Sequence, residues 1–323
     1  MKNKLHHIFF LLLIASAVQA QQTPQYSLYM LNQAAQNPAY VGLENTLVAN
    51  GVYRTQWVGL NGAPVTQIVN AHLPFNVINS GFGLQFENDE AGASQRTSVS
   101  LAYSYHLQIN RESLLSIGIS GGMLQQTLDG GKLRTPDGNY DPDANIIIHN
   151  DDLLPTGSVS ETVPTFAAGV FFQGEKLEAG VGMLNLQESS VNFDGLSVNL
   201  KRNFYLSAAY NLDLSRNLVL KPSLQVKSDL VQTQAEVSAI VKLKDNLFLG
   251  TSYRGFTPDS QDAIIAIGGF RLSQNWTVAY AYDITLSPLN TVSSGSHEIM
   301  LGYNFGKPIG QGVPPPIIYN PRF

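Results

Sequence analysis

The chain of 323 residues contains no cysteine. This absence excludes disulfide bonds, thiolate metal sites, a cysteine nucleophile and a lipobox for lipid attachment. The fold must therefore be held by packing and hydrogen bonds alone. The chain also lacks an excess of basic residues, since 19 Lys and Arg face 24 Asp and Glu for a formal charge of -5. An acidic chain is a poor nucleic-acid binder.

Long apolar runs are missing beyond the first twenty residues. None approaches the roughly 20 residues that a membrane-spanning helix needs, whereas a spanning strand needs only about 9 to 11. The mean hydropathy of -0.03 suits a membrane β-barrel and a soluble β protein equally. The pattern of residues along the chain therefore has to decide between these two classes.

The amino terminus has the layout of an export signal. Lys2 and Lys4 precede the apolar run 8–14, and Val18 and Ala20 have the spacing of the residues before a signal-peptidase cleavage site. This pattern predicts a signal peptide over residues 1–20. Its removal takes two lysines away, so 17 basic residues remain against 24 acidic ones and the net charge becomes -7. The alternative, an amino-terminal membrane anchor, requires a longer apolar run.

The mature chain alternates in polarity with the period of a β-strand. In residues 296–305, Ile299, Leu301, Tyr303 and Phe305 point one way, and polar or small residues point the other. An apolar face ending in aromatics suits a strand with lipid outside and water inside. About fourteen such segments occur, starting near Leu47, Val65, Gly81, Arg96, Ser113, Pro164, Leu177, Asn203, Asn217, Gln234, Asn246, Ala263, Trp276 and Ser296.

The connections between these segments are read as alternating in length. Those at 76–80, 109–112, 174–176, 213–216, 244–246 and 273–275 are tight, and the intervening ones, including 128–163 and 186–202, are longer. Single-chain outer-membrane barrels have short periplasmic turns, long outer loops and an even number of strands. The prediction is an all-β, transmembrane antiparallel barrel of about 14 strands over residues 46–305, with both termini in the periplasm. A propeller or a β-sandwich is the alternative.

Two flanks fall outside the predicted barrel. Residues 21–45 are too irregular for a strand and too rich in Tyr for a disordered tail, which favours a segment in the lumen or on the periplasmic side. Residues 306–323 contain Pro308, Pro314, Pro315, Pro316 and Pro321. This tail is interpreted either as an extended segment that docks on a partner or as an unstructured terminus.

No pattern of catalytic or metal-binding residues is complete. Residues 137–145 resemble the start of a calcium loop, but Pro142 replaces the turn glycine and Ile148 replaces the bidentate Glu. No arrangement of a serine with the histidines supplies a base, a group that orients it and an oxyanion donor, and there is no phosphate-binding loop. We therefore predict that the chain is not an enzyme and holds neither a cofactor nor a metal. Arg54, Asp89, Arg254, Asp262, Asp283 and Glu298 are expected to brace the barrel wall, to line a channel or to hold an inserted segment.

With these residues in view, the chain resembles the PorP/SprF family of type IX secretion system outer-membrane proteins. The resemblance rests on ordered blocks: 25–30 and 37–42, then 53–59 with 62–64 and Thr66, 164–170, 222–223, 253–254, 262–263, 282–283 with Ser287, and 295–299. Thr165 departs from the acidic residue expected there. The candidates for partner binding or structural motifs are Arg54, Gln56, Trp57, Gly59, Gly62, Ala63, Pro64, Thr66, Tyr253, Arg254, Asp262, Tyr282, Asp283, His297, Glu298, Tyr319 and Phe323.

The resemblance implies a noncatalytic component of the secretion and gliding machinery in the cell outer membrane. It implies export or surface anchoring of a large adhesin-like cargo through the cargo's carboxy-terminal sorting domain. Further implied partners are periplasmic and outer-membrane secretion components, including a peptidoglycan-binding lipoprotein, and membrane lipid. Two other functions stay open at this point: a channel for small or hydrophobic solutes, and an outer-membrane lipid hydrolase.

Overall fold

The structure is a computed structural model that describes residues 23–141, 146–193, 195–244, 246–256 and 262–306. The predicted signal peptide and the proline-rich tail from residue 307 onward, with Tyr319 and Phe323, lie outside the described residues. None of the helices in the described part is long and apolar enough to cross a membrane.

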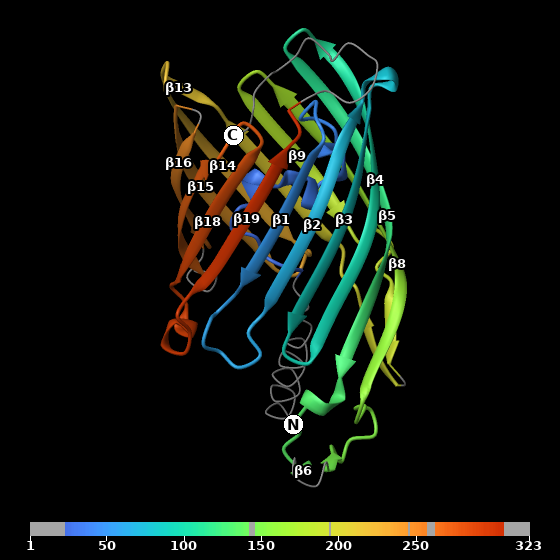
Figure 1. Ribbon diagram of the computed structural model, residues 1–323. Helices are drawn as coiled ribbons and strands as arrows, with labels where there is room; N and C mark the ends of the chain where they lie inside the picture. The colour runs from blue at the N-terminus through green and yellow to red at the C-terminus, as the bar shows by residue number, and fades with distance from the viewer. Residues whose placement is uncertain (1–22, 142–145, 194, 245, 257–261, 307–323) are drawn as a thin grey trace, which may run out of the picture.

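Fourteen antiparallel strands of the described chain close into a barrel (Figure 1), as the alternating sequence predicted. Each strand pairs with its neighbour along the chain, β1 pairs with β19, and β12 pairs with β14. The barrel strands are β1 (Val48–Thr55), β2 (Val65–Phe75), β3 (Ser80–Ala91), β4 (Ser94–Asn110), β5 (Ser113–Asp129), β8 (Ser158–Gly174), β9 (Leu177–Leu184), β12 (Asn203–Tyr210), β14 (Leu218–Ser228), β15 (Thr233–Leu243), β16 (Leu247–Arg254), β17 (Ala263–Arg271), β18 (Trp276–Thr285) and β19 (Ser296–Asn304).

The predicted strand starts agree with the structure except at β8. That strand begins at Ser158, well before the expected start at Pro164. Proline normally interrupts a sheet because it has no N–H to donate. Here β8 pairs with β9 only from Ala168 onward, so Pro164 lies where one edge of β8 has no strand partner. The missing N–H therefore costs no hydrogen bond of the ladder.

The two ends of the barrel differ in their connections. One end, the short-turn end, carries the six tight turns that the sequence predicted. The other, the loop end, carries residues 56–64, 130–157 and 185–202, where the small hairpins β6 (Asn139–Asp141) with β7 (Ile146–Ile148) and β10 (Ser190–Phe193) with β11 (Leu196–Asn199) form.

The expectation of strictly longer connections at the loop end is wrong in two places. β3 and β4 are joined by Gly92 and Ala93 alone, and β14 and β15 by residues 229–232. The left-handed backbone of Gly92, with φ of 60°, allows the two-residue turn.

The barrel wall is higher on one side. β4, β5 and β8 have 17 residues each, whereas β1 and β16 have 8. Since a spanning strand needs about 9 to 11 residues, the long strands project beyond the membrane at the loop end. Figure 1 shows them reaching furthest toward that end. The outward side chains there are polar, and Thr97 donates to Asn88 at 2.9 Å while Thr127 pairs with Ser160 at 2.8 Å.

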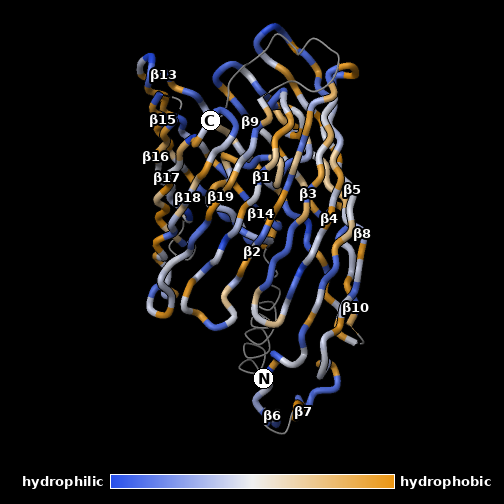
Figure 2. The backbone as a smooth tube through the Cα atoms, in the orientation of Figure 1, coloured by the Kyte–Doolittle hydropathy of each residue, from blue (hydrophilic) through white to orange (hydrophobic). Residues whose placement is uncertain are grey.

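Nearer the short-turn end the outward side chains are apolar. Leu84 and Leu101 on the high side, and Ile299 and Leu301 on β19, are among the most exposed apolar residues. Figure 2 shows the polar and apolar residues alternating along the strands. This alternation is the lipid-facing pattern that residues 296–305 predicted.

Residues 23–46, here called the lumen segment, run through the inside of the barrel (Figure 1). Thr23 contacts Asn203 at 3.2 Å at the loop end, and Thr46 donates to Asn304 at 2.8 Å at the short-turn end, just before β1 begins. Between them lie three short 3-10 helices, η1 (Tyr29–Leu31), η2 (Gln33–Ala35) and η3 (Pro38–Tyr40). The Asn37 side chain caps η3 by accepting from Ala39 N at 3.0 Å.

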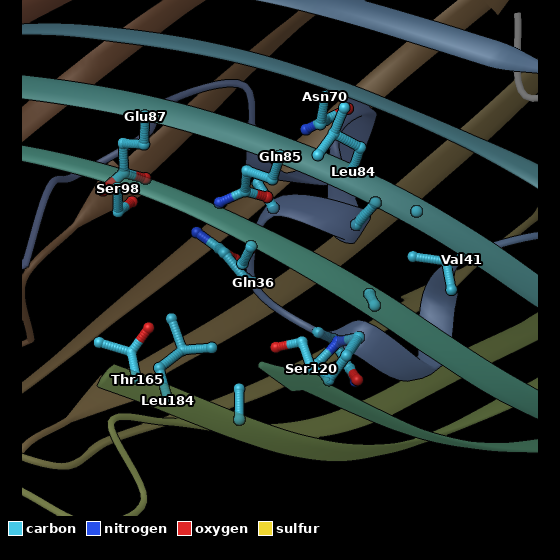
Figure 3. Close-up of a pocket in the computed structure, with 18 of the residues that line it drawn as sticks. Gln36, Val41, Asn70, Leu84, Gln85, Glu87, Ser98, Ser120, Thr165 and Leu184 are labelled. Atoms are coloured by element: carbon cyan, nitrogen blue, oxygen red, sulfur yellow. The ribbon is translucent and has the colours of Figure 1, made fainter. Parts of the chain in front are cut away.

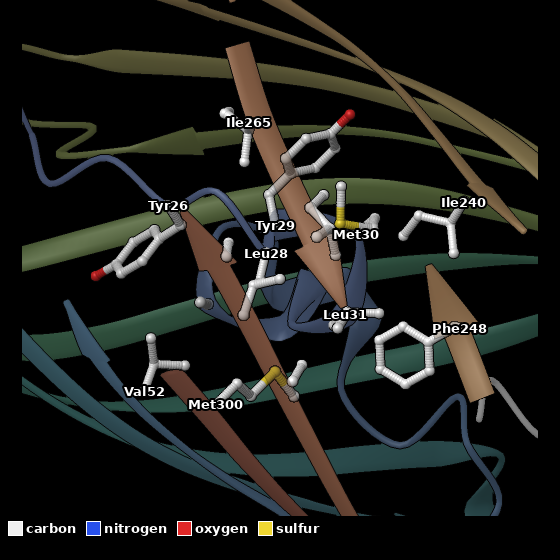
Figure 4. Close-up of a cluster of buried hydrophobic side chains, with 14 of the residues drawn as sticks. Tyr26, Leu28, Tyr29, Met30, Leu31, Val52, Ile240, Phe248, Ile265 and Met300 are labelled. Carbon is white, nitrogen blue, oxygen red and sulfur yellow. The ribbon is translucent and has the colours of Figure 1, made fainter. Parts of the chain in front are cut away.

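The lumen segment converts half of the barrel interior into a hydrophobic core (Figure 4). Leu28, Tyr29 and Met30 pack against inward residues of the wall, including Ile265 and Phe248, and all are almost completely buried. Each such side chain contributes about 1.5 to 3 kcal/mol by leaving water. On this side of the barrel the inward residues of the wall therefore face a packed segment.

Wall glycines allow the lumen segment to lie directly against the strands. A Cβ on Gly118 would lie 2.3 Å from the backbone N of Ala39, and one on Gly81 would lie 2.2 Å from the carbonyl O of Val41. Beside these contacts the Ser116 hydroxyl donates to the carbonyl of Ala39 at 2.5 Å. The segment and the wall therefore fit backbone to backbone at the short-turn end.

We predict that Gly118→Ala lowers the free energy of unfolding by about 1 to 3 kcal/mol, because the methyl group would displace the lumen segment. Denaturant unfolding of the purified barrel measures this change. Gly121→Ala is the control, since its Cβ would meet only the Phe166 ring at 3.5 Å, an ordinary contact. Equal stability of the two variants would contradict the close fit.

Candidate functional site in the barrel lumen

The ionisable residues singled out in the strands meet inside the barrel as one buried network. Arg54 on β1 lies directly opposite Glu298 on β19, and its guanidinium is 3.1 Å from that carboxylate. The same guanidinium is 2.8 Å from Asp283 on β18. The three side chains are no more than 2% exposed. Successive side chains of a strand point to opposite faces, and all three of these side chains point to the inner face.

Arg254 on β16 extends the network along the wall. It lies opposite Glu236 on β15, donates to that carboxylate at 2.7 Å, and donates to Asp283 at 2.9 Å. Asp262, just before β17, is 3.8 Å from the same guanidinium. Asp283 is therefore shared by both arginines, and two cations are set against four carboxylates.

Ser27 of the lumen segment is the point at which the network meets the inserted chain. Its hydroxyl accepts from Arg54 at 2.8 Å and from Arg254 at 2.9 Å, and donates to Asp283 at 2.7 Å. The backbone N–H groups of Ser27 and Leu28 donate to Glu298 at 2.7 and 3.0 Å. One serine and two peptide groups of the lumen segment thus satisfy charges that come from four different strands.

Because these charges are buried, each of them needs a charged or hydrogen-bonding partner. A charge removed from water is tolerated only when it is paired and hydrogen-bonded, and removing one partner leaves the other charge uncompensated. The network therefore fixes the position of the lumen segment relative to the wall as well as the relative position of five strands.

The remaining candidates lie elsewhere in the structure. Gln56 donates to Gln25 of the lumen segment at 3.3 Å, next to the network. Thr66 donates to Asp89 at 2.6 Å, apart from it. Tyr282 and His297 stack on the outer face with ring centroids 5.0 Å apart, and Tyr253 packs edge-on against Phe256, also outside the lumen.

The block from Trp57 to Pro64 forms the β1–β2 loop at the loop end. Gly59 and Gly62 have φ of 100° and 72°, a backbone conformation that residues with a side chain rarely adopt. The backbone N of Ala63 donates to the carbonyl O of Leu60 at 3.1 Å. The Trp57 backbone N donates to Ser296, and Pro64 O accepts from Gln56 N. This block therefore joins two neighbouring loops and does not touch the arginines.

Two members of the network were not among the sequence candidates. Glu236 stands at an inward position of a predicted strand, so its period-2 placement was a usable signal. Ser27 had no such signal, because its segment has no regular period.

A serine and a histidine do come within hydrogen-bond distance, at Ser104 and His106, 2.9 Å apart. Both lie under the lumen segment, where the Ser104 hydroxyl donates to the carbonyl of Val41 at 2.7 Å. His149, in the loop with the calcium-like pattern, is held by Tyr140 and by the carbonyl of Pro155, each at 3.0 Å. Residues 142–145 of that loop lie outside the described residues.

We predict that Arg54→Met lowers the free energy of unfolding by about 3 to 5 kcal/mol, because Glu298 and Asp283 would keep buried charges without their partner. Denaturant unfolding in detergent measures the loss. Lys132→Met is the control, since it removes an exposed pair with Glu90 that contributes little. A loss no larger than that of the control would argue that the network does not hold the fold.

The chain is similar in fold to several outer-membrane barrels of known structure. The toluene transporter TbuX of Ralstonia pickettii is 11% identical with a TM-score of 0.51, and the match covers 85% of this chain and 92% of that one. The outer-membrane protein Omp33 of Acinetobacter baumannii is 8% identical with a TM-score of 0.46, covering 80% and 98%. The monoaromatic hydrocarbon channel CymD is 12% identical with a TM-score of 0.47, covering 88% and 94%. Comparison with curated proteins gives no match.

At these identities the likeness to TbuX shows only the outer-membrane barrel fold. The family evidence is stronger, because the model of the type IX secretion system membrane protein PorP/SprF matches residues 18–303, nearly the whole chain. The chain belongs to the PorP/SprF family and is an outer-membrane β-barrel component of the type IX secretion system.

Proposed function

We propose that this barrel is a noncatalytic anchor that holds a large adhesin-like protein at the cell surface through that protein's carboxy-terminal domain. The observation that carries the proposal is the occupied lumen. Residues 23–46 lie inside the barrel, and buried ions tie them to β1, β16, β18 and β19. A barrel so filled has no passage for a folded protein, so transport falls to another part of the machinery.

In this proposal the short-turn end faces the periplasm and the loop end faces outward, as in other single-chain outer-membrane barrels. β1 begins and β19 ends at the short-turn end. The proline-rich tail after Phe305 would then continue toward periplasmic components of the machinery, among them a peptidoglycan-binding lipoprotein. An extended, proline-rich segment suits docking because little entropy is lost on binding.

The projecting wall supplies the outward surface of the anchor. The inner face of β5 and β8 near the loop end is covered by the β10–β11 hairpin, through a cluster of Leu124, Val163, Val191 and Phe193. This packing makes the wall and hairpin a rigid block above the membrane. A rigid surface loses little entropy on binding, which suits the holding of a cargo domain.

We expect deletion of the gene to remove one or a few large proteins from the cell surface while other proteins exported by the type IX system remain. Quantitative mass spectrometry of proteins released by protease from intact cells measures this. Restoring the gene is the control. Loss of every type IX substrate would indicate general secretion, and an unchanged set of surface proteins would overturn the anchoring proposal.

The channel function is the second candidate and makes an opposite prediction. Because the lumen segment packs backbone to backbone against the wall near the short-turn end, the purified barrel should carry no steady ion current across a planar bilayer. A variant lacking residues 23–44 should conduct. A matched thermal melt of the two proteins checks that the variant is folded. Steady current through the intact barrel would favour a solute channel.

A further inference from the structure

The half of the lumen opposite the hydrophobic core contains a crevice (Figure 3). It has a cavity volume of about 110 Å³, is open to solvent, and lies between the lumen segment and the inner face of β2–β5, β8, β9 and β12. Its lining begins near Arg96 and Tyr205, toward the loop end, and ends at His72 and Val41. The crevice is thus a space along the inserted segment that the segment itself does not fill.

Several polar side chains of the crevice wall have no hydrogen-bond partner among the described residues, unlike those of the ion network. The side chains of Gln85, Ser98, Ser100, Ser120 and Thr165 make no hydrogen bond with any described residue. Arg96 makes no hydrogen bond or ion pair with a described residue either, and its Nε is buried. Five polar residues and one cation of the strands therefore face this space with hydrogen-bonding groups that no described residue uses.

The same wall already binds peptide carbonyls nearer the short-turn end. Ser104 on β4 donates to the carbonyl of Val41 at 2.7 Å, and Ser116 on β5 donates to that of Ala39 at 2.5 Å. Ser100 and Ser120 stand four residues further along the same inner faces, where no peptide lies against them. The wall thus has the same chemistry twice, once occupied by the lumen segment and once free.

The pairing register of β3, β4, β5 and β8 places small and polar residues side by side along the crevice. Gln85, Ser100, Gly122 and Thr165 are direct neighbours across β3, β4, β5 and β8. In the next row toward the short-turn end lie Gly83, Ala102, Ser120 and Ala167. Small residues in adjoining rows leave room for a chain to approach the wall. From Arg96 to Ala102 the strand rises about 20 Å, enough for about six extended residues.

We propose that this crevice binds an extended peptide segment of small, uncharged residues from the terminal domain of the anchored protein, entering from the loop end. The proposal rests on the anchoring function given above. Serine hydroxyls and the Gln85 amide would pair with peptide groups, as Ser104 and Ser116 do with the lumen segment. A large side chain would not fit between the small residues of the wall. A charged side chain would find no counterion in the rows from Gln85 to Thr165 and from Gly83 to Ala167, since Glu87 and Arg96 lie nearer the loop end.

The first test fills the crevice. Ser100→Trp projects a large ring into it, and Leu101→Trp, the next residue on β4, projects the same ring toward lipid. The probe is the recombinant carboxy-terminal domain of the protein that disappears from the surface in the deletion strain. We expect Ser100→Trp to raise the dissociation constant about tenfold or more and Leu101→Trp to change it less than about twofold.

A second measurement does not depend on tolerance of the bulky ring. Because the chain has no cysteine, Ser100→Cys introduces a single thiol, and Thr127→Cys introduces one on the outer polar face of β5 as a control. Binding of the domain should slow maleimide labelling at position 100 about tenfold and leave labelling at position 127 unchanged.

The outcomes separate the two proposals. If the domain binds but neither Ser100→Trp nor labelling at position 100 responds, the crevice is not the binding site and the anchoring function stands. If the domain does not bind the wild-type barrel, both proposals fall.

Discussion

A buried charge inside a barrel needs partners, and here an inserted peptide supplies them. The guanidinium groups of Arg54 and Arg254 both reach the hydroxyl of Ser27, and Glu298 accepts two backbone N–H groups from the same stretch. Without Ser27 and Leu28 these groups would lose bonds that no other described residue is placed to replace. The wall and the lumen segment therefore stabilise each other, since each satisfies polar groups that the other buries.

This dependence divides the interior into two unequal halves. Beside β15–β19 and β1 the lumen is a packed core in which Leu28 and Met30 contact the wall. Beside β3–β5 and β8 small and polar residues leave an open crevice. A barrel of this width can be filled by side chains and one strand of polypeptide, but it cannot pass a folded domain. This limit is the physical basis of the proposal that the barrel holds a partner and leaves transport to another component.

The barrel wall is highest at β4, β5 and β8, which have 17 residues each. β4, β5 and β8 continue past the lipid-facing band with polar outward side chains, and the β10–β11 hairpin covers the inner face of β5 and β8. The crevice lies at the foot of this projecting wall. A partner that settled on the loop end would thus meet a rigid surface and the mouth of the crevice at the same place.

The sequence by itself determined the strands, because alternation is a local property. The starts of thirteen barrel strands lie within two residues of those expected. The start of β8 differs because Pro164 lies at an edge of that strand without a strand partner. It also marked Arg54, Arg254, Asp283 and Glu298 as charges at inward positions, and ordered motifs gave the family. Only the tertiary structure decided that these charges share Ser27, which lies more than 200 residues from Arg254 and Asp283 along the chain. No local pattern encodes such a contact. Whether an inward position faces water or a packed segment depends on the closure of the whole barrel, and therefore on every strand at once.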